Sequence, residues 1–258
     1  MLKFRTVTFL FCLSAVAAAV FHAHLFVWII LIFCYIALIT YGSANIRSGF
    51  YLKAFCHGDR SLKKAAITFD DGPDGEHTAE LLDLLRENGI KASFFCIGGK
   101  IDQYPSIVNR MHTEGHLIGN HSFSHDHFFP LKPVAEIRKE LIRTKDLIEK
   151  LTGKPNLYFR PPFGVTNPGI ARALKGLDFM VIGWSIRSFD LSDKNPEAIV
   201  DRILTKLRGG DIILLHDTSP HILPVLKSLL VNLKLLGWEV VRHDELINDN
   251  TKNNGAVE

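Results

Sequence analysis

The chain has 258 residues, 47% of them hydrophobic, and a formal net charge of only +3. This length fits one domain of ordinary size with an appendage and is short for two full domains. The weak charge, with no basic stripe interleaved with aromatic residues, excludes nucleic acid as an expected partner.

Two apolar runs, Thr6–Phe21 and Leu25–Tyr41, open the chain and are separated by His22-Ala23-His24. Each is a little shorter than the roughly 20 residues that cross a bilayer core. They can form a helical hairpin, one long tilted span or a cleaved signal peptide. The long second run and the poor cleavage site at 17–19 favour a retained anchor over residues 1–45, with one or two transmembrane helices and two preferred. We therefore predict integration in the cell membrane, in contact with membrane lipid.

Basic residues flank both apolar runs, so the sequence leaves the side of the membrane open. Lys3 and Arg5 precede the first run, whereas Arg47, Lys53 and Arg60 follow the second. Positively charged flanks stay on the cytoplasmic side of a membrane. A hairpin would therefore leave the following domain inside the cell, and a single span would place it outside.

Short apolar runs alternate with longer amphipathic runs after residue 60, which predicts strands alternating with helices. We expect strands over 65–69, 91–97, 116–119, 157–159, 179–183, 211–215 and 238–241. We expect helices over 77–88, 105–114, 133–151, 167–174, 196–207 and 220–236. This order predicts an α/β fold with a parallel sheet, and about seven strands favour a small, distorted (β/α) barrel over a full eightfold one.

Three further segments complete the expected organisation of the chain. Residues 46–63 are a linker, 64–247 form the catalytic domain, and 248–258 are a polar tail without regular structure.

Polar side chains follow the apolar part of five expected strands. They are Asp70-Asp71, Asn120-His121, Arg160, Trp184 and His216. Because the carboxyl ends of parallel strands open on one face, where active sites assemble, we expect these side chains to meet there.

His121 and His125 are spaced i, i+4, which predicts that both imidazoles lie on one side of a helical turn and bind one cation. With one aspartate of the Asp70-Asp71 pair they make a three-ligand site with open positions, typical of a catalytic metal. The glutamate of an HExxH motif is absent, which argues against a zincin-type peptidase. The alternative for the acidic pair is a plain turn, because Asp-Asp-Gly-Pro-Asp at 70–74 is rich in turn residues.

The remaining polar residues predict hydrolysis of an amide or ester. Adjacent aspartates point to different sides, so one can ligate a metal while the other faces the reacting water. A metal polarises a carbonyl and acidifies its bound water, and a carboxylate base removes the proton. His216 is the candidate acid for the leaving group, Arg160 can keep the base ionised, and the loop 161–164 can aim a backbone N–H at the oxyanion.

Four ordered segments resemble four of the five signature motifs of the polysaccharide deacetylase family, which has the NodB-homology domain and is carbohydrate esterase family 4. They are Thr68–Pro73, His121–His125, Arg160–Gly164 and Ile213–Asp217. The resemblance runs from about Lys64 to about Ile247 and implies a distorted (β/α) barrel that removes N- or O-acetyl groups from sugars.

The resemblance also implies the role of each matching residue. Asp70 matches the general base, His216 the general acid and Arg160 the residue that orients the base. The implied metal ligands are Asp71, His121 and His125, and the implied cofactor is one divalent metal ion, zinc in most of the family.

The fourth motif departs from the family pattern. Arg187 stands where an aspartate is usual, and Leu191 where an aromatic residue is usual. These departures affect how Arg160 and His216 are held, and Asp190 can take over that anchoring role. Activity is expected to persist because every metal and acid–base position is filled. The expected substrate-side and supporting residues are Phe163, Trp184, Arg187, Asp190 and Leu214.

We therefore predict a metal-dependent hydrolase that removes acetyl groups, chiefly N-acetyl, from a sugar polymer or lipid-linked sugar of the cell envelope. The alternatives are a related deformylase or amidase acting on a lipid-carried amino sugar, and an inactive binding protein.

Overall fold

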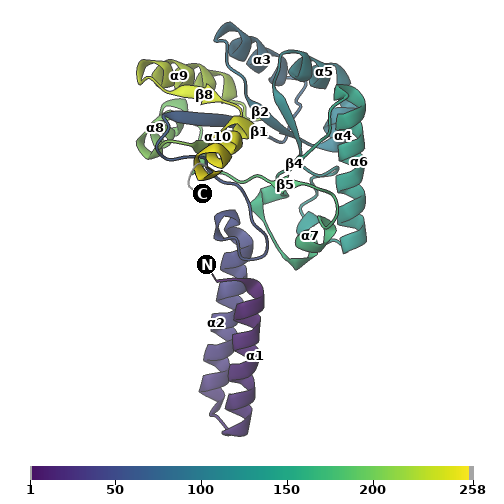
Figure 1. Ribbon diagram of the computed structural model, residues 1–258, viewed down its shortest axis with the longest axis vertical. Helices are drawn as coiled ribbons and strands as arrows, with labels where there is room; N and C mark the ends of the chain where they lie inside the picture. Colours follow the sequence, from purple (N-terminus) through teal and green to yellow (C-terminus); the bar gives the residue numbers. More distant parts are fainter. Residues whose placement is uncertain (1, 256–258) are drawn as a thin grey trace.

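The computed structural model describes residues 2–255, and its N-terminus is a helical hairpin that projects from the rest of the chain (Figure 1). Helices α1 (Phe4–Val20) and α2 (Leu25–Ala44) run antiparallel and contact each other through Tyr35. The Tyr35 hydroxyl lies 3.1 Å from Thr8 Oγ1, and its ring stacks on Phe11 at 4.3 Å. The break between the helices excludes one continuous span. Helix α2 is long and apolar enough to cross a membrane, and α1 is shorter.

The rest of the chain is built on a curled sheet in which every pair of adjacent strands is parallel (Figure 1). Its order is β5-β4-β3-β2-β1-β7-β6, with β8 paired to β1. The strands are β1 (Lys64–Asp70), β2 (Ser93–Cys96), β3 (Leu117–Asn120), β4 (Tyr158–Phe159), β5 (Met180–Val181), β6 (Ile186–Arg187), β7 (Asp211–His216) and β8 (Glu239–Val241). The predicted distorted barrel is confirmed, and it is open rather than closed. Strand β6 was not among the predicted strands.

Helices cover the outer face of this sheet (Figure 1). They are α3 (Thr78–Glu87), α4 (Gly98–Gln103), α5 (Pro105–Thr113), α6 (Val134–Thr152), α7 (Pro168–Ala173), α8 (Pro196–Lys206) and α9 (Ile222–Leu235). Helix α10 (His243–Gly255) packs on the opposite face, where Leu246 contacts the cluster of Ala66, Phe95, Ile182 and Ile212. Their ends follow from local chemistry. Proline occupies the first turn of α5, α7 and α8, where no backbone N–H is needed. Asn167 and Asn195 accept hydrogen bonds from the first backbone N–H groups of α7 and α8.

The main core lies between the sheet and the helices. Strand β1 is buried over Ala65–Asp70, because it has neighbours on both sides and side chains packed on both faces. Ile67 and Phe69 pack against the apolar faces of α3, α5, α8 and α9. Such a strand holds its C-terminal residues firmly, and those residues are Asp70 and, next to it, Asp71.

The linker and the tail are more ordered than the sequence indicated. Phe55 and His57 pair with Ile182 and Asp211, so the linker runs along the sheet. The expectation of an irregular tail over 248–258 is wrong as far as Gly255, because α10 extends to that residue. Leu246 is only 1% exposed, and Lys64 Nζ lies 2.9 Å from Asp249 Oδ2. These contacts hold α10 on β1; residues 256–258 lie outside the described part of the chain.

Candidate active site

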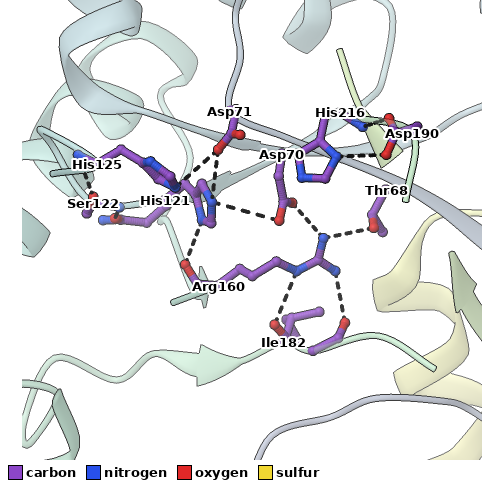
Figure 2. A network of polar contacts seen from close by, with 12 residues as sticks. Thr68, Asp70, Asp71, His121, Ser122, His125, Arg160, Ile182, Asp190 and His216 are labelled. Carbon is purple, nitrogen blue, oxygen red and sulfur yellow. Dashed lines mark hydrogen bonds and ion pairs between the residues drawn. The ribbon is translucent and has the colours of Figure 1, made fainter. Parts of the chain in front are cut away.

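Three potential metal ligands converge at the C-terminal end of the sheet (Figure 2). One ligand atom each from Asp71, His121 and His125 lies within 4.8 Å of the other two. Asp71 Oδ1 is 3.4 Å from His121 Nε2 and 3.2 Å from His125 Nε2. This oxygen is buried and has no hydrogen-bond partner among the described residues. A buried carboxylate oxygen facing two imidazoles is a donor set that fits a divalent cation.

The turn after β1 directs Asp71 toward the histidines. Asp71 has φ 72°, a left-handed conformation that bends the chain at the end of β1. Gly72 is needed next, because a Cβ at this position would come within 1.9 Å of Asp217 Oδ2. Asp217 also accepts a hydrogen bond from the Thr78 hydroxyl at 2.8 Å, and burial raises its pKa to about 7.

The segment that carries both histidines is a loop, and the predicted helical turn is wrong. Ser122 and His125 have φ 63° and 49°, values that interrupt a helix. Asn120 Oδ1 accepts from the Ser122 backbone N–H, and Glu140 of α6 accepts from the N–H groups of the next two residues. The imidazoles therefore meet because tertiary hydrogen bonds fold the loop, with ring centroids 4.8 Å apart.

The ring orientation of His121 and the protonation states of His125 and Asp71 suit a metal. His121 Nδ1 donates to the Arg160 carbonyl at 2.8 Å, which leaves Nε2 free to bind. Burial lowers the pKa of His125 to about 4, which keeps it neutral. Burial also opposes ionisation of Asp71, but His121 and His125 outweigh it and hold the pKa of Asp71 well below its usual range. For His121, Asp70 and Asp71 outweigh burial and raise the pKa.

Asp70 lies beside this cluster and is fixed by Arg160 (Figure 2). Arg160 Nη1 donates to Asp70 Oδ1 at 2.6 Å and to Thr68 Oγ1 at 2.9 Å. The guanidinium is fully buried, donates to the carbonyls of Ile182 and Gly183, and lies 4.0 Å from the Phe95 ring centroid. This arrangement leaves Asp70 Oδ2 toward the metal ligands, 3.8 Å from His121 Nε2.

His216 approaches from β7 and is held by Asp190 (Figure 2). Its Nδ1 donates to Asp190 Oδ1 at 2.9 Å, and its backbone N–H donates to Asp190 Oδ2 at 2.8 Å. Asp190 is 1% exposed and also accepts from the Ser188 hydroxyl at 2.6 Å. Burial disfavours the charged imidazole, but the hydrogen bond and charge of Asp190 outweigh it and raise the pKa of His216. In this arrangement Asp190, rather than Arg187, contacts the histidine.

A cavity of about 180 Å³ joins these groups and is lined by every predicted supporting residue except Asp190. Its other walls are Phe163, Gly164, Trp184, Arg187, Phe189, Leu191, Ser192 and Leu214. Phe163 is 41% exposed, and its ring centroid lies 4.6 Å from that of His125. Phe189 and Thr68 were not among the predicted site residues. Only their position in the sequence signals them, since Phe189 precedes Asp190 directly and Thr68 lies two residues before Asp70.

Comparison with known proteins identifies the class to which this fold and site belong. The sequence profile described as polysaccharide deacetylase matches residues 57–182. The chain is 32% identical over 198 residues to the peptidoglycan-N-acetylmuramic acid deacetylase PdaA of Bacillus subtilis, with 75% of each chain covered. The chain therefore belongs to the polysaccharide deacetylase family, as the motifs predicted.

Two further matches define its relation to particular members. It is 34% identical over 168 residues to a peptidoglycan-N-acetylglucosamine deacetylase of Bacillus cereus, covering 65% of this chain and 60% of that relative. The solved structure of the Bc1960 peptidoglycan N-acetylglucosamine deacetylase superposes with a TM-score of 0.70 at 30% identity, covering 74% of this chain and 91% of that one. The chain spans only 39% of the length of the related Listeria monocytogenes proteins.

Proposed function

We propose that this chain is a zinc-dependent N-deacetylase of an N-acetylated amino sugar of the cell envelope. The observation that carries the proposal is the meeting, in one cavity, of Asp71, His121 and His125 with Asp70 on one side and His216 on the other. Two imidazoles and one carboxylate with open positions are typical of catalytic zinc. The names of the relatives, which are peptidoglycan deacetylases, support an amino sugar as the substrate.

The residues of the chain divide the work of amide hydrolysis. A bound zinc ion supplies Lewis acidity and lowers the pKa of water in the site. Asp70 takes the proton from the attacking water, and Arg160 keeps Asp70 deprotonated and in place. His216 then gives a proton to the leaving nitrogen, and Asp190 holds its other ring nitrogen. One water is consumed, and acetate and a free amine are released.

The N-terminal hairpin supports attachment of this enzyme to a membrane. At 1.5 Å per residue, the 17 residues of α1 and 20 residues of α2 extend about 25 and 30 Å, close to the thickness of a bilayer core. Apolar side chains that face away from the protein cover both helices. They include Leu10, Leu13, Val16, Ile29, Ile32, Phe33 and Ile36, each at least 47% exposed.

The charges at the base of the hairpin favour a cytoplasmic catalytic domain. Both helix ends near the catalytic domain carry basic residues, Lys3 and Arg5 on one side and Arg47 and Lys53 on the other, whereas the far turn has no Lys or Arg. Under the positive-inside rule this end stays in the cytoplasm. A lipid-linked sugar precursor at the cytoplasmic face is then the substrate that the enzyme reaches. A C-terminal reporter active only in the cytoplasm tests this assignment, and activity of a reporter that works only outside the cytoplasm would instead point to the assembled polymer.

The test of the catalytic proposal separates metal binding from turnover. The full-length protein is loaded with zinc, and acetate release is measured with N-acetylated chitooligosaccharide, peptidoglycan and lipid-linked amino sugars. Asp70→Asn should bind zinc as the wild type does and lose turnover. Retained turnover in Asp70→Asn would refute the base assignment. Release of formate from an N-formyl sugar, without acetate release from its N-acetyl counterpart, would identify a deformylase. Binding of these sugars without release of acetate or formate would favour an inactive binding protein.

A further inference from the structure

Arg187 places a guanidinium without a counterion in the wall of the catalytic cavity. It ends strand β6, is exposed, and lines the same cavity as Asp71, His125 and His216. Its backbone pairs with Leu214, two residues before His216. Within residues 2–255 its side chain makes no hydrogen bond or ion pair, and its contact is with the Phe189 ring. The guanidinium therefore faces the space that a substrate would occupy. Its hydrogen-bond donors are free within the described part of the chain.

The aromatic ring of Phe189, called the Phe189 platform below, lies against the Arg187 guanidinium. Phe189 lies next to two guanidinium groups, with its ring centroid 5.1 Å from Arg187 Cζ and 5.8 Å from Arg202 Cζ. Arg202 is itself held, because it donates to the Ser188 carbonyl at 2.6 Å and to Asp193 Oδ2 at 2.5 Å. The loop that carries Phe189 is therefore tied to α8. An arginine stacked on a ring keeps its edge available for hydrogen bonds.

The carboxylates of the site already have partners. Asp70 is paired with Arg160, Asp71 faces His121 and His125, and Asp190 accepts from His216. The buried Arg160 is committed to Asp70 and to backbone carbonyls. Arg187 is thus the cavity cation that remains for a group from outside the chain.

We infer that Arg187 binds an anionic substituent of the substrate, a carboxylate or a phosphate close to the N-acetyl group that is hydrolysed. This inference rests on the proposed deacetylase function. The planar guanidinium matches both anions with paired N–H donors, which fixes orientation as well as affinity. Two sources carry such an anion: the lactyl carboxylate of an N-acetylmuramic acid, and the phosphate that links a sugar to a carrier. A neutral N-acetylglucosamine polymer offers neither.

The test compares neutral and anionic substrates in the zinc-loaded full-length protein. The substrates are an N-acetylglucosamine oligomer, an oligomer that contains N-acetylmuramic acid, and N-acetylglucosamine 1-phosphate. Arg187→Gln should reduce kcat/KM on the preferred anionic substrate by about 10- to 100-fold, mainly by raising KM, and leave the neutral substrate within about twofold. Arg187→Lys should restore part of the loss. Arg208→Gln is the matched control, because Arg208 is exposed and lies outside the cavity.

The outcomes separate this inference from the proposed function. A wild-type preference for the muramic acid substrate or for the sugar phosphate identifies the source of the anion. Equal losses on neutral and anionic substrates, or no loss in Arg187→Gln, would overturn the inference while leaving the deacetylase intact. If the wild type hydrolyses none of the three substrates, the proposed function fails. Calorimetric binding of the two anionic sugars to wild type and Arg187→Gln then decides the inference by itself, with equal affinity overturning it.

Discussion

Replacement of Asp190 by asparagine removes the charge that holds the proposed general acid. Asp190 Oδ1 lies 2.9 Å from His216 Nδ1, and the side chains are 0% and 14% exposed. Opposite unit charges about 4 Å apart interact by about 4 kcal/mol at an effective dielectric constant of 20. The partial exposure of His216 and the hydrogen bond that asparagine retains reduce this effect. The effect that remains is roughly 1.4 to 2.7 kcal/mol, and the pKa of His216 should fall accordingly.

The sign of the effect on activity follows from the role of His216. An acid must be protonated, so activity is lost as pH rises through its pKa, and Asp190 moves that loss to higher pH. Asp190→Asn should shift the basic limb of the kcat/KM profile down by about 1 to 2 pH units, which lowers activity above that limb by about 10- to 100-fold. Asp201→Asn on α8 is the matched control, because Asp201 is exposed. An unchanged basic limb in folded Asp190→Asn would refute the reasoning.

Three further predictions follow from the same geometry. Asp71→Ala and His125→Ala should each lose stoichiometric zinc after dialysis, measured by elemental analysis, and retention of one zinc per chain would contradict the ligand set. Arg160→Met should lower the free energy of unfolding by about 3 to 5 kcal/mol in urea titrations, because it strands the buried Asp70. Leu246→Ala should lower the free energy of unfolding by about 2 to 5 kcal/mol, whereas Leu235→Ala, at a 79% exposed position, should change it little. Equal effects of the two substitutions would show that α10 is not held on β1.

The sequence predicted the longer elements and the site at the strand ends because these depend on strong, local patterns. The continuous apolar run before Asp70 marks a strand buried on both faces, and parallel connections bring such strand ends together. Strand β6 has only two residues and gives no periodic signal. The short helix α4 begins with two glycines, which disfavour a helix locally, and was missed for that reason.

Tertiary contacts account for the features that the sequence did not predict. The two histidines at i, i+4 suggested a helical turn, but Asn120 and Glu140, from β3 and α6, hold them in a loop. Helix α10 has a polar composition and is held by the contacts of Leu246 and Asp249 with the sheet. The Phe189 platform depends on Arg202, whose side chain reaches it from another element. None of these contacts is visible from spacing alone.

Acetate release from an N-acetylated amino sugar, measured while zinc is titrated into the metal-free full-length protein, tests the central claim most directly. The account predicts no release without metal and release that rises until one zinc is bound per chain, with Asp71→Ala inactive at every concentration. Release that is unaffected by removal of the metal, or equal in wild type and Asp71→Ala, would contradict the assignment of this cavity as a metal-dependent deacetylase site.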